Sequence, residues 1–316
     1  MTATMQRPAK LKVRRPDIDL SATPKYWVLD DPQATHALNI LNFGIPAGER
    51  FFVDSVRLAM PYIRDKALTA DARAFIGQET VHARYHEKAA EHLGLFDLPG
   101  IQARIDRADR TREALYKRVN ALPEPLRRRA TIAWLSSTLL GEHFTALFAD
   151  IALNPRKIDR SALDPAMETL LGWHASEEME HRTLPFDIYT HIGGDYVTRV
   201  VPLAATMGLL PLALIGVTEL MMRLDPDIDG GFSLRDHVRA VRAKRLPSLL
   251  DVVAKLPMYF RPGFHPSHLG DDFRAREFLG GGWTCAPPGS CSSPAPGAAS
   301  AGPSPSSSPG RPPPWS

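Results

Sequence analysis

Cysteine is scarce in this chain: only two occur among 316 residues, Cys285 and Cys291, and both lie close to the C-terminal end. Disulfide bonds therefore cannot stabilise the rest of the chain, which favours a reducing compartment, and we expect a cytoplasmic protein. The basic N-terminus is followed by no apolar run, so a secretory signal is not expected.

Excess charge of one sign is also absent, since the net charge is only +3. Basic residues are scattered apart from the N-terminal arm and the run at 127–129, and such a run most often lies on a solvated face. We therefore expect no nucleic-acid partner. With 44% hydrophobic residues, the chain is long enough to build one large domain with a sizeable core.

Long apolar runs are rare as well, and the clearest exception is 200–218, which carries no charge. Its length approaches the ~20 residues that span a bilayer, but Pro202, Gly208 and Pro211 interrupt it. We interpret it as a buried or groove-lining helix beside an apolar substrate. Peripheral membrane contact through the same segment is the alternative.

The patterns that remain are helical, because apolar residues recur at three- and four-residue spacing with little strand-like alternation. We predict an all-α fold with four long core helices and several extra helices. Pro46 opens the first core helix, and Thr69 or Asp71 caps the second, which Gly94 ends. A charged helix follows at about 101–119.

Two further core helices follow Pro125, separated by a loop. The first is apolar and continues to about 148, and Asp164 and Pro165 then start the second, which is expected to continue to Ile192. A basic helix is predicted at 234–256, with a break at Pro247.

The composition divides the chain into three parts. Residues 1–33 are expected to form a loosely ordered arm and 34–278 the helical domain. Residues 279–316 are rich in Gly, Pro, Ser and Ala and cannot bury enough apolar surface to offset the entropy of ordering. We predict a disordered tail there, whose composition also fits a shifted reading frame in GC-rich DNA.

Glutamate and histidine residues on apolar helix faces carry the chemical signal, because a buried carboxylate without a partner is costly. Glu79 and His82 are three residues apart, so both project from one face, and Glu178 and His181 repeat this spacing. Glu49 and Glu142 each lie in an apolar stripe of another helix.

One Glu from each of two helices, with Glu-x-x-His from each of two others, is the ligand arrangement of ferritin-like di-metal carboxylate proteins. Four carboxylates and neutral imidazoles without sulfur suit iron better than zinc, with manganese and zinc as alternatives. We therefore predict a ferritin-like bundle with two metal ions. The predicted ligands are Glu49, Glu79, His82, Glu142, Glu178 and His181.

Further residues near this pattern could be either ligands or neighbours of the ligands. His174 precedes Glu178 by four residues, so it is either a seventh ligand or a packed histidine. Glu177 competes with Glu178 for the ligand position, and we favour Glu178. His143 points about 100° away from Glu142 and is expected to pack or to be partly exposed. Residues that could orient ligands by hydrogen bonds are His86, Glu177, Asp187, Tyr189 and Arg50.

Over most of 10–275 the chain resembles a bacterial family described as predicted metal-dependent hydrolase, which implies metal-dependent hydrolysis. The stretches that carry this resemblance are Val-Arg-Arg at 13–15, Pro-Ala-Gly-Glu-Arg-Phe-Phe at 46–52, Gln-Glu-Thr-Val-His at 78–82 and His-Ala-Ser-Glu-Glu-Met-Glu-His at 174–181. The ligand spacing is also similar to that of di-iron arylamine N-oxygenases, which add one histidine to six ligands. His174 stands at that position.

Three functions fit these features. The leading hypothesis is a di-iron oxidase or oxygenase that uses dioxygen and an electron donor to oxidise a small apolar or amphipathic substrate. The first alternative is a hydrolase that uses a metal-bridged water. The second is a non-enzymatic metal-binding or membrane-associated protein. The sequence leaves the oligomeric state open, a homodimer included.

Overall fold

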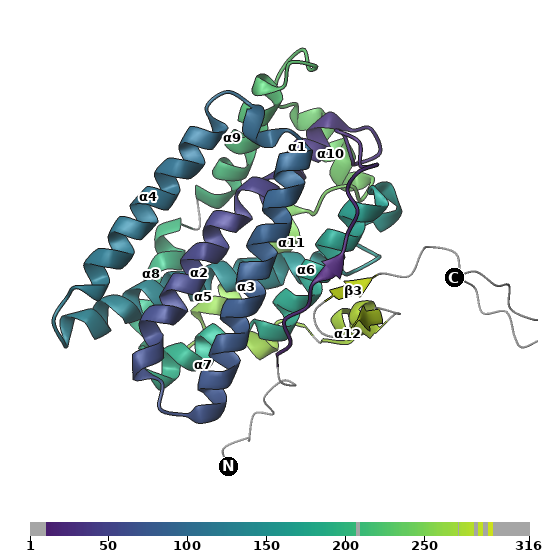
Figure 1. Cartoon of the computed structure of the whole chain (residues 1–316). Coiled ribbons are helices and arrows are strands. Elements are labelled where there is room, and N and C mark those ends of the chain that lie inside the picture. The colour runs from purple at the N-terminus through teal and green to yellow at the C-terminus, as the bar shows by residue number, and fades with distance from the viewer. Residues whose placement is uncertain (1–10, 207–208, 271, 281–283, 287–289, 293–316) are drawn as a thin grey trace, which may run out of the picture.

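A computed structural model describes residues 11–206, 209–270, 272–280, 284–286 and 290–292. Within these residues helices account for nearly all of the regular secondary structure (Figure 1), so the all-α prediction is confirmed. The helices are α1 (Pro32–Phe43), α2 (Ile45–Ala59), α3 (Lys66–His92), α4 (Ile101–Asn120), α5 (Leu126–Ala152), α6 (Pro165–His181), α7 (Leu184–His191), α8 (Tyr196–Thr206), α9 (Leu209–Leu224), α10 (Leu234–Arg242), α11 (Leu249–Val253) and α12 (Phe273–Gly280).

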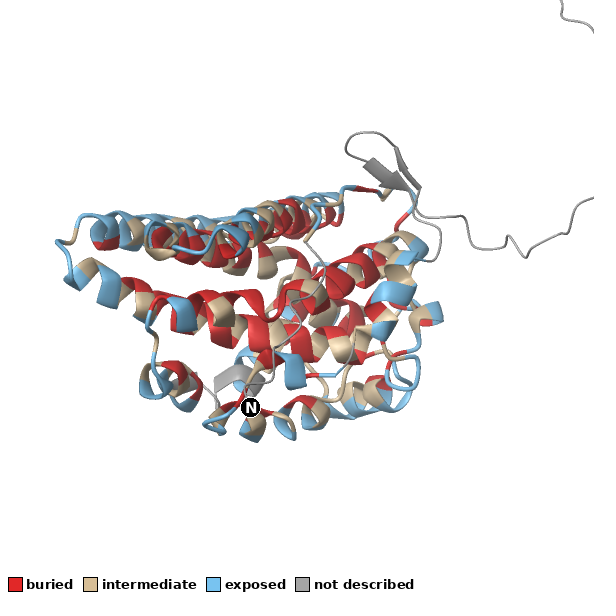
Figure 2. Ribbon diagram, turned by 90° about the horizontal axis from the view of Figure 1, so that it is seen from below, coloured by how far each residue is buried: buried red, intermediate tan, exposed pale blue. Residues whose placement is uncertain are grey.

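Four of these helices form the bundle that carries the predicted ligands. α2 packs against α3 and α5, and α6 packs against α5 and α3, so the four contact one another in a closed cycle. Their buried faces meet inside the molecule, as the colouring in Figure 2 shows. The ferritin-like assignment of this bundle stays a prediction.

The start of α3 differs from the prediction of Thr69 or Asp71 as its cap. Asp65 is the cap, because its carboxylate accepts a hydrogen bond from the backbone N–H of Leu68. The helix ends as expected at Gly94, whose φ of 66° is readily adopted by glycine.

The helix predicted from Pro165 to Ile192 is two helices, α6 and α7. Asp164 caps α6 as expected, accepting hydrogen bonds from the N–H groups of Ala166 and Met167. The break after His181 follows from Pro185, which has no N–H to donate to the His181 carbonyl and whose ring would clash with it. The helix that presents the second Glu-x-x-His pair therefore ends at its histidine.

The N-terminal arm is more ordered than predicted within the residues that the structure describes. Trp27 and Val28 are buried in the core, and the Trp27 carbonyl accepts a hydrogen bond from the Asp164 N–H at the start of α6. The helix that follows the arm, α1, begins at Pro32 and was not predicted. The arm is held in place because it buries large side chains against the bundle.

A small sheet joins the arm to residues near the C-terminal end. Its strands are β1 (Pro16–Asp17), β2 (Thr284–Ala286) and β3 (Ser290–Ser292), with β3 between the other two. β3 runs parallel to β1 and antiparallel to β2. β2, β3 and the end of α12 belong to the segment predicted to be disordered, and the remainder of that segment lies outside the described residues.

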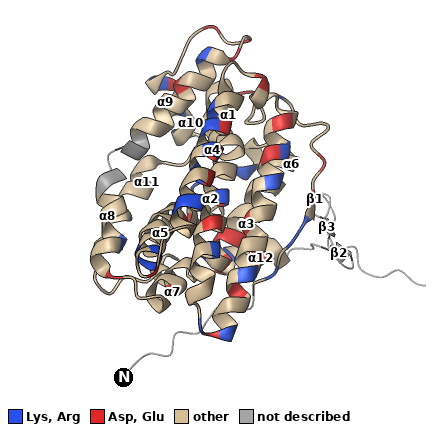
Figure 3. Cartoon of the chain, turned by 60° about the vertical axis from the view of Figure 1, so that its left-hand side comes forward, with Lys and Arg blue, Asp and Glu red and all other residues tan. Residues whose placement is uncertain are grey.

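The apolar run at 200–218 is divided between α8 and α9, with 207–208 outside the described residues. Figure 3 shows both helices largely without charged residues. Among the described helices, none has both the length and the hydropathy of a membrane span. The basic helix predicted at 234–256 is likewise divided, into α10 and α11, with Pro247 in the gap as expected.

Candidate metal centre

The bundle brings all seven predicted ligands together from α2, α3, α5 and α6. Each of the seven residues is at most 5% exposed. They are Glu49, Glu79, His82, Glu142, His174, Glu178 and His181. Residues that are up to 132 positions apart in the sequence (181 − 49) therefore share one buried cluster.

Two overlapping groups within this cluster have the geometry of a metal site. One ligand atom from each of Glu79, His82, Glu178 and His181 lies within 4.8 Å of the others, and Glu49, His82 and His174 form a second such group. His82 belongs to both groups. Glu142 joins them through His181, whose Nδ1 lies 3.2 Å from Glu142 Oε2.

Six of the eight carboxylate oxygens of the cluster have no hydrogen-bond partner among the described residues. Among the described residues, both side-chain oxygens of Glu49 and of Glu79 are buried without a hydrogen bond, as are one oxygen of Glu142 and one of Glu178. Buried polar atoms are nearly always satisfied, and leaving a carboxylate unpaired is costly. A cation between these oxygens would remove that cost, so the residues fit a metal centre.

Burial and mutual repulsion disturb the proton affinities of these carboxyl groups. Burial, followed by the charge of Glu178, raises the pKa of Glu49 and of Glu79 well above the usual value. Burial also raises the pKa of Glu142, to about 7. Burial opposes ionisation of Glu178 too, but interactions led by the charge of His181 outweigh it and lower its pKa to about 2. Without metal the cluster therefore retains protons.

His82 is oriented by a charged residue outside the ligand set. Its Nε2 lies 2.9 Å from Glu177 Oε2, and a carboxylate can only accept, so Nε2 carries the proton. The lone pair of Nδ1 then faces Glu49 and Glu178, at 3.9 and 3.8 Å. Arg14 holds Glu177 in turn, at 2.8 Å. This is the carboxylate–histidine arrangement that orients metal ligands.

A chain of hydrogen bonds fixes the tautomer of His174. Trp27 can only donate, so the Asn39 oxygen accepts from it at 2.9 Å, and the Asn42 amide donates to the same oxygen at 3.3 Å. The Asn42 oxygen therefore faces His86 Nδ1, at 3.0 Å, and that nitrogen must donate. His86 Nε2 then accepts from His174 Nδ1 at 2.6 Å.

The consequence lies at the other nitrogen of His174. Nε2 keeps its lone pair and points at carboxylate oxygens of Glu178 and Glu49, 2.9 and 3.4 Å away. Two such oxygens around a nitrogen lone pair repel it unless a proton or a metal cation lies between them. This geometry suits a ligand, and the role of His174 as the seventh ligand stays a prediction.

Three of the residues proposed to orient ligands form their hydrogen bonds elsewhere. Arg50 binds Glu87 and the two Asp109 oxygens, so it affects Glu49 only through its charge. Asp187 contacts His265 at 3.4 Å. The Tyr189 hydroxyl donates to a backbone carbonyl. Arg50 points away from the ligand because adjacent helical residues point in different directions. Asp187 and Tyr189 lie on α7, beyond the break that follows His181.

Arg14 and Asn42 are parts of the centre that were not predicted from the sequence. Arg14 lies in the Val-Arg-Arg stretch that carries the family resemblance, and this was a usable signal for a role at the site. Asn42 lies on the unpredicted helix α1 and belongs to no chemical motif. Only its position beside His86 shows what it does.

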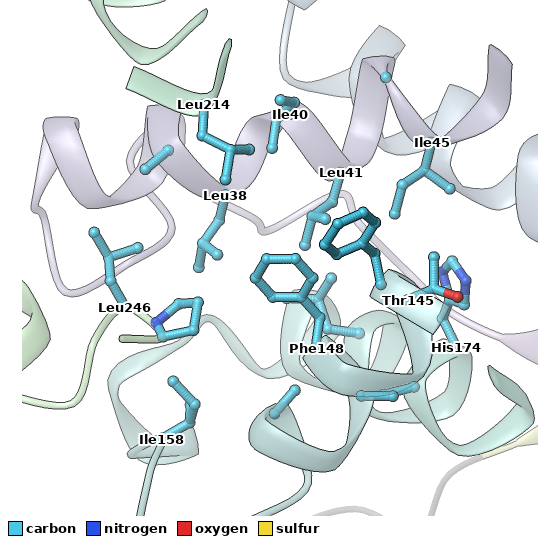
Figure 4. A pocket seen from close by; sticks show the side chains of 18 of the residues that line it. Leu38, Ile40, Leu41, Ile45, Thr145, Phe148, Ile158, His174, Leu214 and Leu246 are labelled. Carbon is cyan, nitrogen blue, oxygen red and sulfur yellow. The ribbon is translucent and has the colours of Figure 1, made fainter. Parts of the chain in front are cut away.

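An apolar cavity of about 490 Å³ adjoins the cluster. His174 and Glu178 are among its lining residues, and Figure 4 shows His174 and Thr145 at one end with Leu246 and Ile158 at the other. The walls between them come mainly from α1, α5, α6 and α9. The predicted groove-lining role of the 200–218 segment is thus fulfilled by α9, through Leu214 and its neighbours.

Comparison with known proteins bears on the same residues. A family model described as "Predicted metal-dependent hydrolase" matches residues 12–270. The chain belongs to this family. The match spans every residue of the cluster and the arm residue Arg14, and it confirms the resemblance noted in the sequence. Among curated proteins and among solved structures, none matches the chain significantly.

Proposed function

We propose that this member of the metal-dependent hydrolase family is a dinuclear iron enzyme, an oxidase or oxygenase that acts on a small apolar or amphipathic substrate. The observation that supports this choice is the cavity beside His174 and Glu178. Its apolar walls would hold a substrate without polar groups next to the centre and would keep bulk water away.

The chain would hold the metal ions by charge balance. The four carboxylates of Glu49, Glu79, Glu142 and Glu178 match the charge of two divalent cations. Burial lowers the pKa of His82 well below its usual value, so this histidine is neutral and free to ligate. The protons that the metal-free carboxyl groups retain would leave when metal binds.

Iron bound at this site would supply the chemistry of dioxygen activation, which no side chain of the cluster can supply alone. The rest is positioning: Glu177 and His86 fix the ring orientations of His82 and His174. In an oxygenase reaction, dioxygen, two electrons from a donor and two protons place one oxygen atom in the product and one in water.

Anaerobic loading with ferrous iron tests this proposal. Protein mixed with oxygenated buffer should take up dioxygen in proportion to its iron content and develop a transient visible absorption. Glu142→Ala should abolish this uptake, whereas Glu113→Ala, on the exposed face of α4, should leave it unchanged. If the iron-loaded protein takes up no dioxygen, the oxygenase proposal is wrong.

The second candidate function is hydrolysis, which the family description favours. Two metal ions in the cluster would acidify a bound water, and buried carboxylates would accept its proton. Protein loaded with zinc or manganese should then cleave a p-nitrophenyl ester at a rate that depends on Glu142. Ester cleavage without dioxygen uptake would decide for hydrolysis.

A further inference from the structure

We propose that the cavity binds a straight-chain amphipathic carboxylate, with its apolar end at the metal cluster and its carboxylate at the opposite end, beside Arg160 and Arg245. This inference depends on the proposed function in one respect: the proposed function decides that the ligand reacts at its apolar end, beside the metal cluster. The ligand class itself follows from the length, the walls and the two ends of the cavity.

The cavity is elongated along two helices of the bundle. α5 lines it from Gly141 to Ala152, a rise of ~16 Å over 11 residues at 1.5 Å each. α6 lines it from Glu168 to Glu178, a rise of ~15 Å. An extended saturated chain about as long as that of dodecanoate matches this length.

The walls between the two ends offer such a chain no polar anchor apart from threonine hydroxyls. The Thr218 hydroxyl donates to the Leu214 carbonyl and that of Thr145 to the Glu142 carbonyl, so both are already engaged. The other wall residues are apolar, among them Leu38, Leu41, Phe144, Phe148, Leu214 and Leu246. Affinity along the walls therefore comes from burial of apolar surface.

The end remote from the cluster is different, because ionisable side chains converge there. Arg160 and Arg245 come from two loops that are joined by a hydrogen bond from the Asp159 N–H to the Lys244 carbonyl. Glu168 and His237 complete the titratable groups that line this end among the described residues. The cavity thus has ligands of the metal cluster at one end, apolar walls along its middle and two arginines at the other end.

Among the described residues, both guanidinium groups have donors left for a ligand, and the Arg160 group also packs over the Phe278 ring at 5.1 Å. Arg160 contacts Glu168 through Nε at 3.1 Å, and Arg245 contacts Asp31 through one terminal nitrogen at 3.2 Å. Their side chains are 39% and 31% exposed, so a head group could reach them from the cavity mouth. A carboxylate would bind the free donors of a planar guanidinium in the geometry that favours two parallel hydrogen bonds.

The two acidic residues offer less to a ligand of opposite charge. Each already faces an arginine, and burial raises the pKa of Glu168, which weakens its hold on a cation. A cationic head group would also have to approach two arginines. The end of the cavity therefore favours a carboxylate over an amine or a neutral alcohol.

Displacement of a fluorescent reporter, anilinonaphthalene sulfonate, from the protein as purified tests this inference. Dodecanoate should displace the reporter at a concentration roughly tenfold lower than dodecanol does, and dodecylamine should be weakest. Arg245→Gln and Arg160→Gln should each remove this advantage of dodecanoate. Arg242→Gln, exposed and three residues before Arg245, should not.

Equal affinity for dodecanoate and dodecanol, or tighter binding of the amine, would overturn the proposal. Arg245→Gln breaks the contact with Asp31, so far-ultraviolet circular dichroism and the unchanged binding of dodecanol verify that it folds. The binding assay requires no turnover. Dodecanoate binding without dioxygen uptake would refute the proposed function alone, and uptake without selective dodecanoate binding would refute this inference alone.

Discussion

Glu142 and His143 are neighbours in α5, yet they belong to two buried polar regions. The two regions differ in how their buried polar groups are compensated. Glu142 faces the cluster, where carboxylates predominate and several oxygens have no partner. His143 packs on the other side, against the rings of Tyr259 and Phe264. It is buried, in line with the first of the two places predicted for it.

The region around His143 contains its own cation. The guanidinium of Arg199 donates to the carbonyls of Tyr259 and Arg261, at 2.7 and 2.9 Å, and lies 5.1 to 5.8 Å from four aromatic ring centroids. Cation–π contacts and charge-assisted hydrogen bonds satisfy it. The Glu142 side is the region that calls for an added ion, because its carboxyl groups retain protons where a metal cation could bind. The Arg199 side already contains its cation.

The largest contrast is expected between substitutions of the two neighbours. Glu142→Ala should lower metal content by about one ion per chain, because the site loses a carboxylate of its charge balance. His143→Phe should leave metal content unchanged and preserve stability, since neither ring nitrogen has a hydrogen-bond partner among the described residues. Elemental analysis and thermal melting measure both; equal metal content in the two variants would remove Glu142 from the ligand set.

Removal of the internal cation tests the second region. Arg199→Met should cost roughly 3 kcal/mol of unfolding free energy or more, because two charge-assisted hydrogen bonds to carbonyls are lost. Metal content should stay constant. Urea denaturation measures the loss. The unfolding free energy of Arg199→Lys, which keeps the charge without the planar guanidinium, should lie between those of the wild type and of Arg199→Met. A concomitant loss of metal would show that the two regions are coupled.

A smaller effect is expected from the residue that orients His82. Glu177→Gln should lower metal affinity roughly 10- to 100-fold while all ligands remain. The matched control is Glu180→Gln, because Glu180 also binds Arg14 and has no hydrogen bond to a predicted ligand. Competition with a fluorescent chelator gives both affinities. If the two variants lose the same affinity, the effect comes from Arg14 and not from His82.

The smallest effect is the pH dependence of metal-free protein. Burial opposes protonation of His181, but Glu142 and Glu178 outweigh it and raise its pKa from 6.5 to about 9. The stability this provides is complete below pH 6.5 and is lost as the pH rises through 9. Burial lowers the pKa of His143 to about 4, so below pH 6.5 the unfolded state binds the extra proton and stability falls.

Melting temperatures of the metal-free protein between pH 4 and 9 check these signs. His143→Phe should reduce the loss on the acid side, and metal binding should remove the loss on the alkaline side, since the ion replaces the proton of the cluster. An alkaline loss that persists in the metal-loaded protein would contradict the assignment of His181 to the site.

The ligand pattern was accessible from sequence because it depends on local geometry. A three-residue spacing places Glu79 with His82, and Glu178 with His181, on one face of any α-helix. An apolar stripe likewise predicts that Glu49 will be buried. The bundle and its seven clustered residues required no more than these rules, together with the cost of burying charge.

Only the tertiary structure decided the contacts between distant segments. Glu177, adjacent to Glu178, became a partner of His82 because α3 and the arm residue Arg14 lie on that side of α6. Asn42 fixes His174 across a gap of 132 residues (174 − 42). The remote end of the cavity depends on the loops of Arg160 and Arg245, which the hydrogen bond from the Asp159 N–H to the Lys244 carbonyl joins. Periodicity predicts which face of a helix is buried, and packing alone decides what that face meets.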